Sequence, residues 1–139
     1  MQRVRDDSGF TLIEIMVVVF ILGLLVTLVA PKIIGRTDEA RRTKAMADIK
    51  GIEEAMHLFK LDNGFYPSTG QGIQALVQRP DAARNYNPDG YLDRVPVDPW
   101  GNGYAYFSDG QDFIIKSYGA DGQEGGEGKN GDIDNQQSS

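Results

Sequence analysis

The stretch Gly9-Phe10-Thr11-Leu12-Ile13-Glu14 begins the apolar run that decides the fold, and this run continues to Ala30. Phe10–Ala30 spans 21 residues and contains one ionisable side chain, Glu14. An α-helix needs about 20 apolar residues to cross a bilayer. Val, Ile and Leu also favour strands, but soluble strands are much shorter, and a lone strand in lipid would leave its backbone groups unpaired. The run therefore predicts a transmembrane helix over 10–30.

Glu14 is unusual within this segment, because a carboxylate in a membrane helix costs up to about 3 kcal/mol on insertion scales. The residues leave two interpretations open. In the first, the side chain reaches the membrane surface and is solvated there. In the second, it pairs with a cationic partner.

The region after the run predicts an amphipathic helix over 31–62, continuous with the first segment or bent from it at Pro31. Asp62-Asn63-Gly64 should end it, with Gly64 as a left-handed cap. The lone histidine, His57, is expected at the rim of the head. The apolar positions recur every three or four residues: Ala45, Ile49, Ile52, Met56 and Phe59. The charged positions are expected either to form a solvated face or to pair between subunits; they include Arg41, Arg42, Lys44, Asp48 and Glu53.

The remaining sequence predicts a small head with mixed structure. A short helix is expected at Ile73–Val77. Two strands are expected at Tyr104–Ser108 and Asp112–Tyr118, with Asp109-Gly110 as a hairpin turn. These elements give an α+β class in which the strands pack on the amphipathic helix.

Composition excludes several functions. A formal charge of −6 argues against a nucleic-acid-binding protein, which normally has a basic face. The absence of cysteine and the presence of one histidine leave few groups for nucleophilic or acid–base catalysis, so a membrane-anchored enzyme is disfavoured. There is no phosphate-binding Gly-x-x-x-x-Gly-Lys-Ser/Thr motif.

The acidic, glycine-rich segment from Gly119 to Gly131 allows two interpretations. Low apolar content is typical of a disordered tail. Carboxylates among glycines are also typical of a calcium loop, because calcium takes six to eight oxygen ligands and glycine lets backbone carbonyls converge. Asp121 and Asp132 have the end-to-end spacing of an EF-hand loop, but its third and fifth positions are Gln123 and Gly125, its last is Asp rather than Glu, and a strand precedes it. An EF-hand is therefore excluded.

The sequence Gly-Phe-Thr-Leu-Ile-Glu at residues 9–14 resembles the type III signal of type IV pilins and of type II secretion pseudopilins. The resemblance implies that residues 1–9 are a leader, which a prepilin peptidase/N-methyltransferase removes after Gly9 before methylating the amino group of Phe10. It also implies that Glu14 pairs with the Phe10 ammonium of a neighbouring subunit in a helical fibre. The lysines and arginines around the apolar run do not favour a cytoplasmic amino terminus, so that orientation is taken from the resemblance.

Motifs further along the chain are similar to those of the major pseudopilins of type II secretion systems. They are Tyr66-Pro67, Thr69–Leu76, Gly90-Tyr91-Leu92, Pro96–Gly101 and Ser117–Gly122. This resemblance implies a type IV pilin-like fold: a long amino-terminal helix, a head over 31–139 with an antiparallel sheet of about three strands, and a calcium loop over 118–134.

The resemblance also implies a ligand set for one Ca²⁺ ion. The carboxylates of Asp121 and Asp132 and the carbonyls of Tyr118 and Gln123 match the family's ligands, and Glu127 and Asp134 are secondary candidates. The ion would replace the disulfide that closes the corresponding region of many pilins.

The implied function is that of the major structural subunit of a periplasmic pseudopilus, a fibre that drives folded proteins across the outer membrane. The alternatives are a type IV pilus pilin and a minor pseudopilin. The subunit would be a single-pass protein of the bacterial inner membrane with its head in the periplasm. The implied partners are other copies of the chain, minor pseudopilins, the inner-membrane platform, the secretion ATPase, the secretin and the exported proteins.

Overall fold

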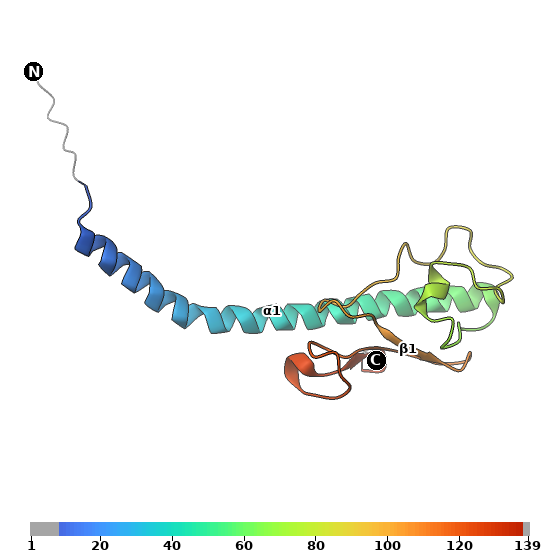
Figure 1. The fold of residues 1–139 in the computed structure, drawn as a ribbon. Helices are drawn as coiled ribbons and strands as arrows, with labels where there is room; N and C mark the ends of the chain where they lie inside the picture. Colours follow the sequence, from blue (N-terminus) through green and yellow to red (C-terminus); the bar gives the residue numbers. More distant parts are fainter. Residues whose placement is uncertain (1–8, 138–139) are drawn as a thin grey trace, which may run out of the picture. The chain divides into compact units, whose positions relative to one another are not determined.

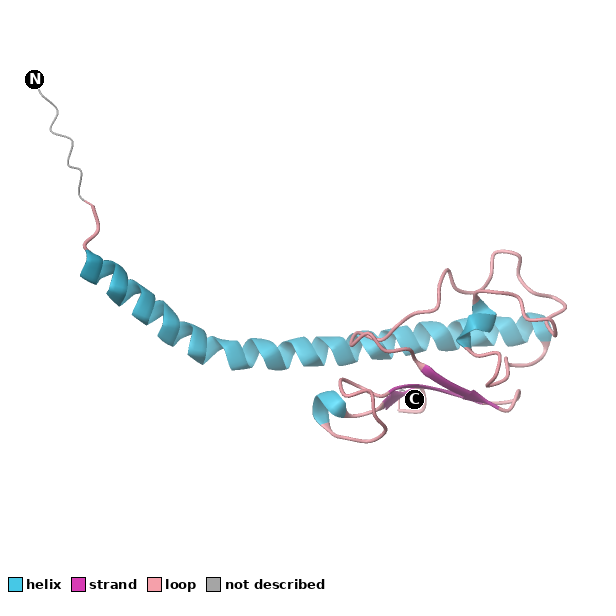
Figure 2. Cartoon of the chain, viewed as in Figure 1, coloured by secondary structure: helices cyan, strands magenta, loops and turns pink. Residues whose placement is uncertain are grey.

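The structure is a computed structural model that describes residues 9–137, apart from the side chains of residues 29–35. Residues 1–8 of the expected leader, and the side chains of Ala30 and Pro31, lie outside this description. The chain divides into two compact units, Met1–Thr37 and Asp38–Ser139. The elements in chain order are α1 (Leu12–Asn63), the 3₁₀ helix η1 (Ile73–Leu76), β1 (Ala105–Ser108), β2 (Phe113–Ser117), the 3₁₀ helix η2 (Gly128–Asn130) and β3 (Ile133–Asp134) (Figures 1 and 2).

The start of α1 is set by Thr11. The Thr11 hydroxyl oxygen accepts the backbone N–H of Glu14 at 3.3 Å, and the Thr11 carbonyl accepts that of Ile15 at 3.2 Å. The first bond satisfies an amide group that has no partner within the helix, and the second is the first bond of the helical series. The helix therefore begins at Leu12, two residues later than predicted.

The apolar side chains along the first unit, from Phe10 to Leu28, are exposed. In the part of the chain that the structure describes, no helix is both long enough and apolar enough to cross a membrane. Position 31 lies inside α1, so the proline does not end the helix there.

The core of the second unit lies under the apolar stripe of α1. Ile49, Ile52, Met56 and Phe59 are almost fully buried, as the helical spacing predicts, and Ala45 is buried with them. Three aromatic rings meet Phe59 edge-on, with centroids 5.4–6.2 Å away: Phe65, Tyr86 and Tyr91. One contiguous core therefore holds α1, the loops and the sheet together.

The carboxyl end of α1 is capped as predicted. Gly64 has a φ of +86°, and its N–H donates to the Lys60 carbonyl at 2.7 Å. This left-handed turn is the conformation in which glycine has no side-chain penalty. His57 lies at the rim, where its Nδ1 is 2.8 Å from the Tyr66 hydroxyl.

The sheet has three antiparallel strands in the order β1-β2-β3. Tyr106 pairs with Ile115, and both are buried on the face toward α1. The two predicted strands are present, but each is shorter than predicted. The predicted helix over 73–77 is the four-residue 3₁₀ turn η1.

Two side chains secure β1 at its ends. The Tyr104 hydroxyl donates to Asp48 Oδ2 of α1 at 3.0 Å, and Lys44 donates to the same oxygen at 2.7 Å. At the other end, the Thr69 hydroxyl donates to the Ser108 carbonyl at 3.0 Å and accepts the Ser108 N–H at 2.8 Å. Burial raises the pKa of Tyr104 well above its ordinary value, and the bond to Asp48 raises it further.

Candidate functional site

The glycine-rich segment forms an ordered loop between β2 and β3. Its return strand is β3, in which Ile133 pairs with Ser117 and is buried in the core. A disordered tail would not bury this side chain, so the structure favours the loop interpretation.

Two glycines let the segment fold tightly on itself. A Cβ on Gly119 would lie 2.9 Å from the carbonyl oxygens of Lys129 and Gly131, and one on Gly126 would lie 2.6 Å from that of Asn130. Both glycines also have positive φ, at +73° and +95°. Backbone therefore approaches backbone across the loop at distances that no side chain would allow.

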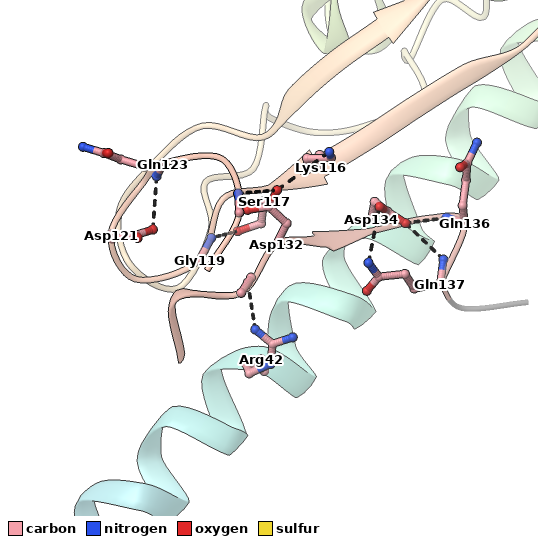
Figure 3. A network of polar contacts seen from close by, with 12 residues as sticks. Arg42, Lys116, Ser117, Gly119, Asp121, Gln123, Asp132, Asp134, Gln136 and Gln137 are labelled. Carbon is pink, nitrogen blue, oxygen red and sulfur yellow. Dashed lines mark hydrogen bonds and ion pairs between the residues drawn. The ribbon is translucent and has the colours of Figure 1, made fainter. Parts of the chain in front are cut away.

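Asp132 is the most enclosed carboxylate of the loop. Its Oδ2 accepts the Gly125 N–H at 3.1 Å and lies 3.8 Å from Lys116 Nζ. Its Oδ1 is buried and has no hydrogen-bond partner among the described residues. Figure 3 shows this carboxylate beside Lys116 at the end of β2.

Asp121, the other predicted carboxylate ligand, lies at a separate point of the same loop. Its Oδ1 accepts the Gln123 N–H at 3.1 Å, which closes a local turn. Asp121 and Gln123 are both exposed. The structure therefore brings Asp121 and Gln123 together directly, and places Asp132 on the opposite arm of the loop.

The secondary candidates are placed differently. Asp134 lies in β3, and its Oδ1 accepts the N–H groups of Gln136 and Gln137. In Figure 3 it lies well away from Asp121. Glu127 is exposed and precedes η2 without forming a side-chain cap.

Arg42 connects α1 to the loop. Its Nη1 donates to the carbonyls of Gly128 and Gly131, both at 2.8 Å. Figure 3 shows Arg42 on the helix, pointing toward the loop. The sequence indicated only that Arg42 belongs to the charged positions of the amphipathic helix. It did not predict that this guanidinium binds the loop of its own chain.

Asp98 supports the loop at the end of β2 and was not predicted as a site residue. It is buried, and its Oδ2 accepts the Ser117 hydroxyl at 2.9 Å while its Oδ1 accepts the N–H groups of Trp100 and Asn102. The Ser117 oxygen in turn accepts the Gly119 N–H at 3.3 Å. Asp98 therefore fixes the point where β2 passes into the loop. The signal in the sequence was the turn Asp98-Pro99-Trp100-Gly101.

The oxygen atoms of the loop are suitable ligands for a hard cation such as Ca²⁺. In the described part of the chain, no group of three or more His, Cys, Asp or Glu side chains is placed to hold a metal ion. A calcium site need not contain three such groups, because backbone carbonyls and water also serve as ligands. The buried, unpartnered Oδ1 of Asp132 is the kind of oxygen that a cation would satisfy.

The first unit contains the predicted assembly residues. Gly9 and Phe10 precede α1, and Glu14 lies in its first turn. Phe10 and Glu14 line one apolar hollow of about 220 Å³, together with Ile15, Val18 and Val19. Glu14 is exposed, so its carboxylate is accessible to a partner.

Two protein-family models match the chain, and together they cover most of it. Residues 32–136 match the family model described as "Type II secretion system (T2SS), protein G". The chain belongs to this family. Residues 4–30 also match the prokaryotic N-terminal methylation motif.

Members of the family resemble the chain over nearly its whole length. Type II secretion system core protein G of Pseudomonas aeruginosa is 54% identical over 140 residues, which cover 97% of this chain and 98% of that protein. The Vibrio cholerae protein of the same name is 49% identical over 139 residues, covering 97% and 95%. The crystal structure of the major pseudopilin from the type 2 secretion system of enterohaemorrhagic Escherichia coli matches with a TM-score of 0.67 and 40% identity, covering 76% of this chain and 90% of that one. The predicted family and pilin-like fold are confirmed.

Proposed function

We propose that the chain is the major structural subunit of a periplasmic pseudopilus, whose growth drives folded proteins across the outer membrane. The observation that carries this proposal is the match to protein G over residues 32–136, next to the methylation motif over 4–30. This pairing favours the major pseudopilin over a type IV pilus pilin or a minor pseudopilin. The role is structural rather than enzymatic.

Processing would create the assembly site. A prepilin peptidase/N-methyltransferase would cleave after Gly9 and methylate the new amino terminus at Phe10. The match to the methylation motif supports this step. Before assembly, the apolar segment 10–30 would anchor the subunit in the inner membrane as a single pass, with the head in the periplasm.

Assembly would join the amino terminus of one copy to Glu14 of the next. Glu14 is exposed in the single chain and lines an apolar hollow, so a neighbouring Phe10 ammonium could reach its carboxylate. An ion pair removed from water and satisfied only by a neighbour favours one register of the fibre over others. The other partners would be minor pseudopilins, the platform with its ATPase, the secretin and the exported proteins.

Calcium would complete the head. Asp132 and Asp121 would supply carboxylates, and Tyr118 and Gln123 would supply carbonyls. A bound ion would neutralise the acidic loop and link its two arms. The unpartnered Oδ1 of Asp132 supports this assignment.

The test of assembly is Glu14→Gln, which removes the charge and keeps the shape of the side chain. In cells that lack the native subunit, we expect this variant to be cleaved and methylated but to form no fibres and to export no cargo. Mass spectrometry would check the processing, and electron microscopy and secretion assays would check the outcome. The matched control is Glu54→Gln, an exposed acid of the head with the same change in charge. Normal fibres from Glu14→Gln would overturn the proposed contact.

A further inference from the structure

In the described part of the chain, two basic residues contact the loop from outside it, and they contact different groups. Lys116, on β2, lies 3.8 Å from a carboxylate oxygen of Asp132, and the two side chains are 22% and 15% exposed. Arg42, on α1, donates to two backbone carbonyls and contacts no carboxylate of the loop. The charge of Lys116 therefore lies next to a predicted calcium ligand, Asp132, whereas the charge of Arg42 lies next to backbone carbonyls.

The Lys116 contact is Coulombic rather than a hydrogen bond, because 3.8 Å is too long for an N–H···O bond. The same Asp132 oxygen already accepts the Gly125 N–H, and the other oxygen has no hydrogen-bond partner within the described residues. The ammonium therefore offsets the charge of a largely enclosed carboxylate without fixing its position. A cation held in this way can be displaced.

We propose that Lys116 is the resident counter-cation of the loop and competes with the divalent ion for Asp132. This inference rests on the proposed calcium site. An enclosed carboxylate without a counter-charge is costly, so Lys116 stabilises the loop before metal arrives. When a divalent cation binds Asp132, the ammonium becomes a like charge beside it and weakens the binding.

The strength of the Lys116 contact therefore sets the calcium concentration at which Ca²⁺ replaces the ammonium as the counter-charge of Asp132. Removing its charge has two effects of opposite sign: the metal-free head becomes less stable, and calcium binds more tightly. If a residue only supported the fold, its substitution would lower both the stability of the metal-free head and the affinity for calcium. Arg42 should behave in this second way, because the carbonyls it binds are not predicted ligands.

The experiment compares full-length variants purified in detergent. Lys116→Met removes the charge and keeps most of the side-chain length, and Lys116→Gln is a second neutral variant in case the first folds poorly. Lys129→Met is the matched control, since Lys129 is an exposed cation of the same loop. Arg42→Met tests the contrast. Calorimetric titration with calcium gives the affinity, and thermal unfolding in chelator gives the stability of the metal-free head.

We expect both neutral variants at Lys116 to bind calcium about fivefold more tightly, the upper end of the range for an ion pair that is partly exposed. Their Tm in chelator should fall by about 3–6 °C. Lys129→Met should change the affinity less than about twofold, since exposed charges are screened. Arg42→Met should lower both stability and affinity.

The possible failures are distinguishable. If the unmodified chain does not bind calcium, the metal assignment is wrong and the competition falls with it. If the unmodified chain binds calcium but the Lys116 variants bind it no more tightly than Lys129→Met does, only the competition is overturned.

Discussion

At the residue scale, the Asp98 carboxylate joins the end of β2 to the turn at Trp100. It is buried and accepts three hydrogen bonds, from the Ser117 hydroxyl and from the N–H groups of Trp100 and Asn102. Asp98→Ala would leave these donors without partners, and we expect a loss of about 2–4 kcal/mol in the free energy of unfolding. Urea unfolding measures it. Asp109→Ala, in an exposed turn, is the comparison and should cost less.

The buried tyrosines predict how stability depends on pH. Burial raises the pKa of Tyr104 and of Tyr106 above the ordinary value of 10.0. Above pH 10, the unfolded chain releases these protons while the folded head retains them, so stability present below pH 10 is lost as the pH rises. Each such tyrosine contributes a slope of at most about 1.4 kcal/mol per pH unit.

Unfolding by urea at pH values between 9 and 12 would check this slope. Tyr104→Phe has no proton to release, so the slope should be shallower in this variant. An identical slope in the two proteins would show that Tyr104 does not contribute to it.

Individual residues were predictable where their neighbours in sequence define a pattern. The buried stripe of α1 follows from its spacing of three and four, and the Gly64 cap follows from the Asp-Asn-Gly sequence. Arg42 and Lys116 were not predictable as loop contacts, because their partners lie 89 and 16 positions away and no local pattern selects them. Thr11 was read only as part of the processing signal, although it also caps α1.

At the element scale, the loop depends on glycine for two separable reasons. Gly125 and Gly126 both have positive φ, but a Cβ on Gly125 would meet nothing within 4 Å, whereas one on Gly126 would lie 2.6 Å from the Asn130 carbonyl oxygen. Gly125→Ala should cost about 1–2 kcal/mol for the left-handed backbone alone. Gly126→Ala should cost at least about 1 kcal/mol more, because the loop must open.

Denaturant unfolding of Gly125→Ala and Gly126→Ala measures the two losses of stability. Their difference gives the cost of the close backbone contact at Gly126, separate from the cost of the left-handed backbone. Equal losses of stability would mean that the two arms of the loop do not lie as close as the structure places them.

The elements were predictable in proportion to their length. Helix α1 has a long periodic signal, and both strands of the hairpin alternate around a turn. Strand β3 has two residues, too few for any alternation, and it exists only because β2 offers Ile133 a partner and a core. The 3₁₀ turn η1 has the apolar residues of a short helix, but four residues are too few to sustain α-helical hydrogen bonds.

At the scale of the whole molecule, calcium should change the stability of the head. Saturation at about a hundred times the Kd would add about 2.7 kcal/mol. Chelation should therefore lower the Tm and reduce both fibre formation and secretion. Asp132→Asn should have a low Tm that chelator no longer changes. An unchanged Tm of the unmodified chain with and without chelator would contradict the calcium proposal.

Thr69 has a consequence for copies of the chain that wait to be assembled. Strand β1 lies at the border of the sheet, and the outer backbone groups of a border strand can recruit a strand from another molecule. The Thr69 hydroxyl already occupies both the donor and the acceptor of Ser108. Association of subunits strand by strand is therefore disfavoured at this point of the sheet, which agrees with the proposed assembly through the amino-terminal helix.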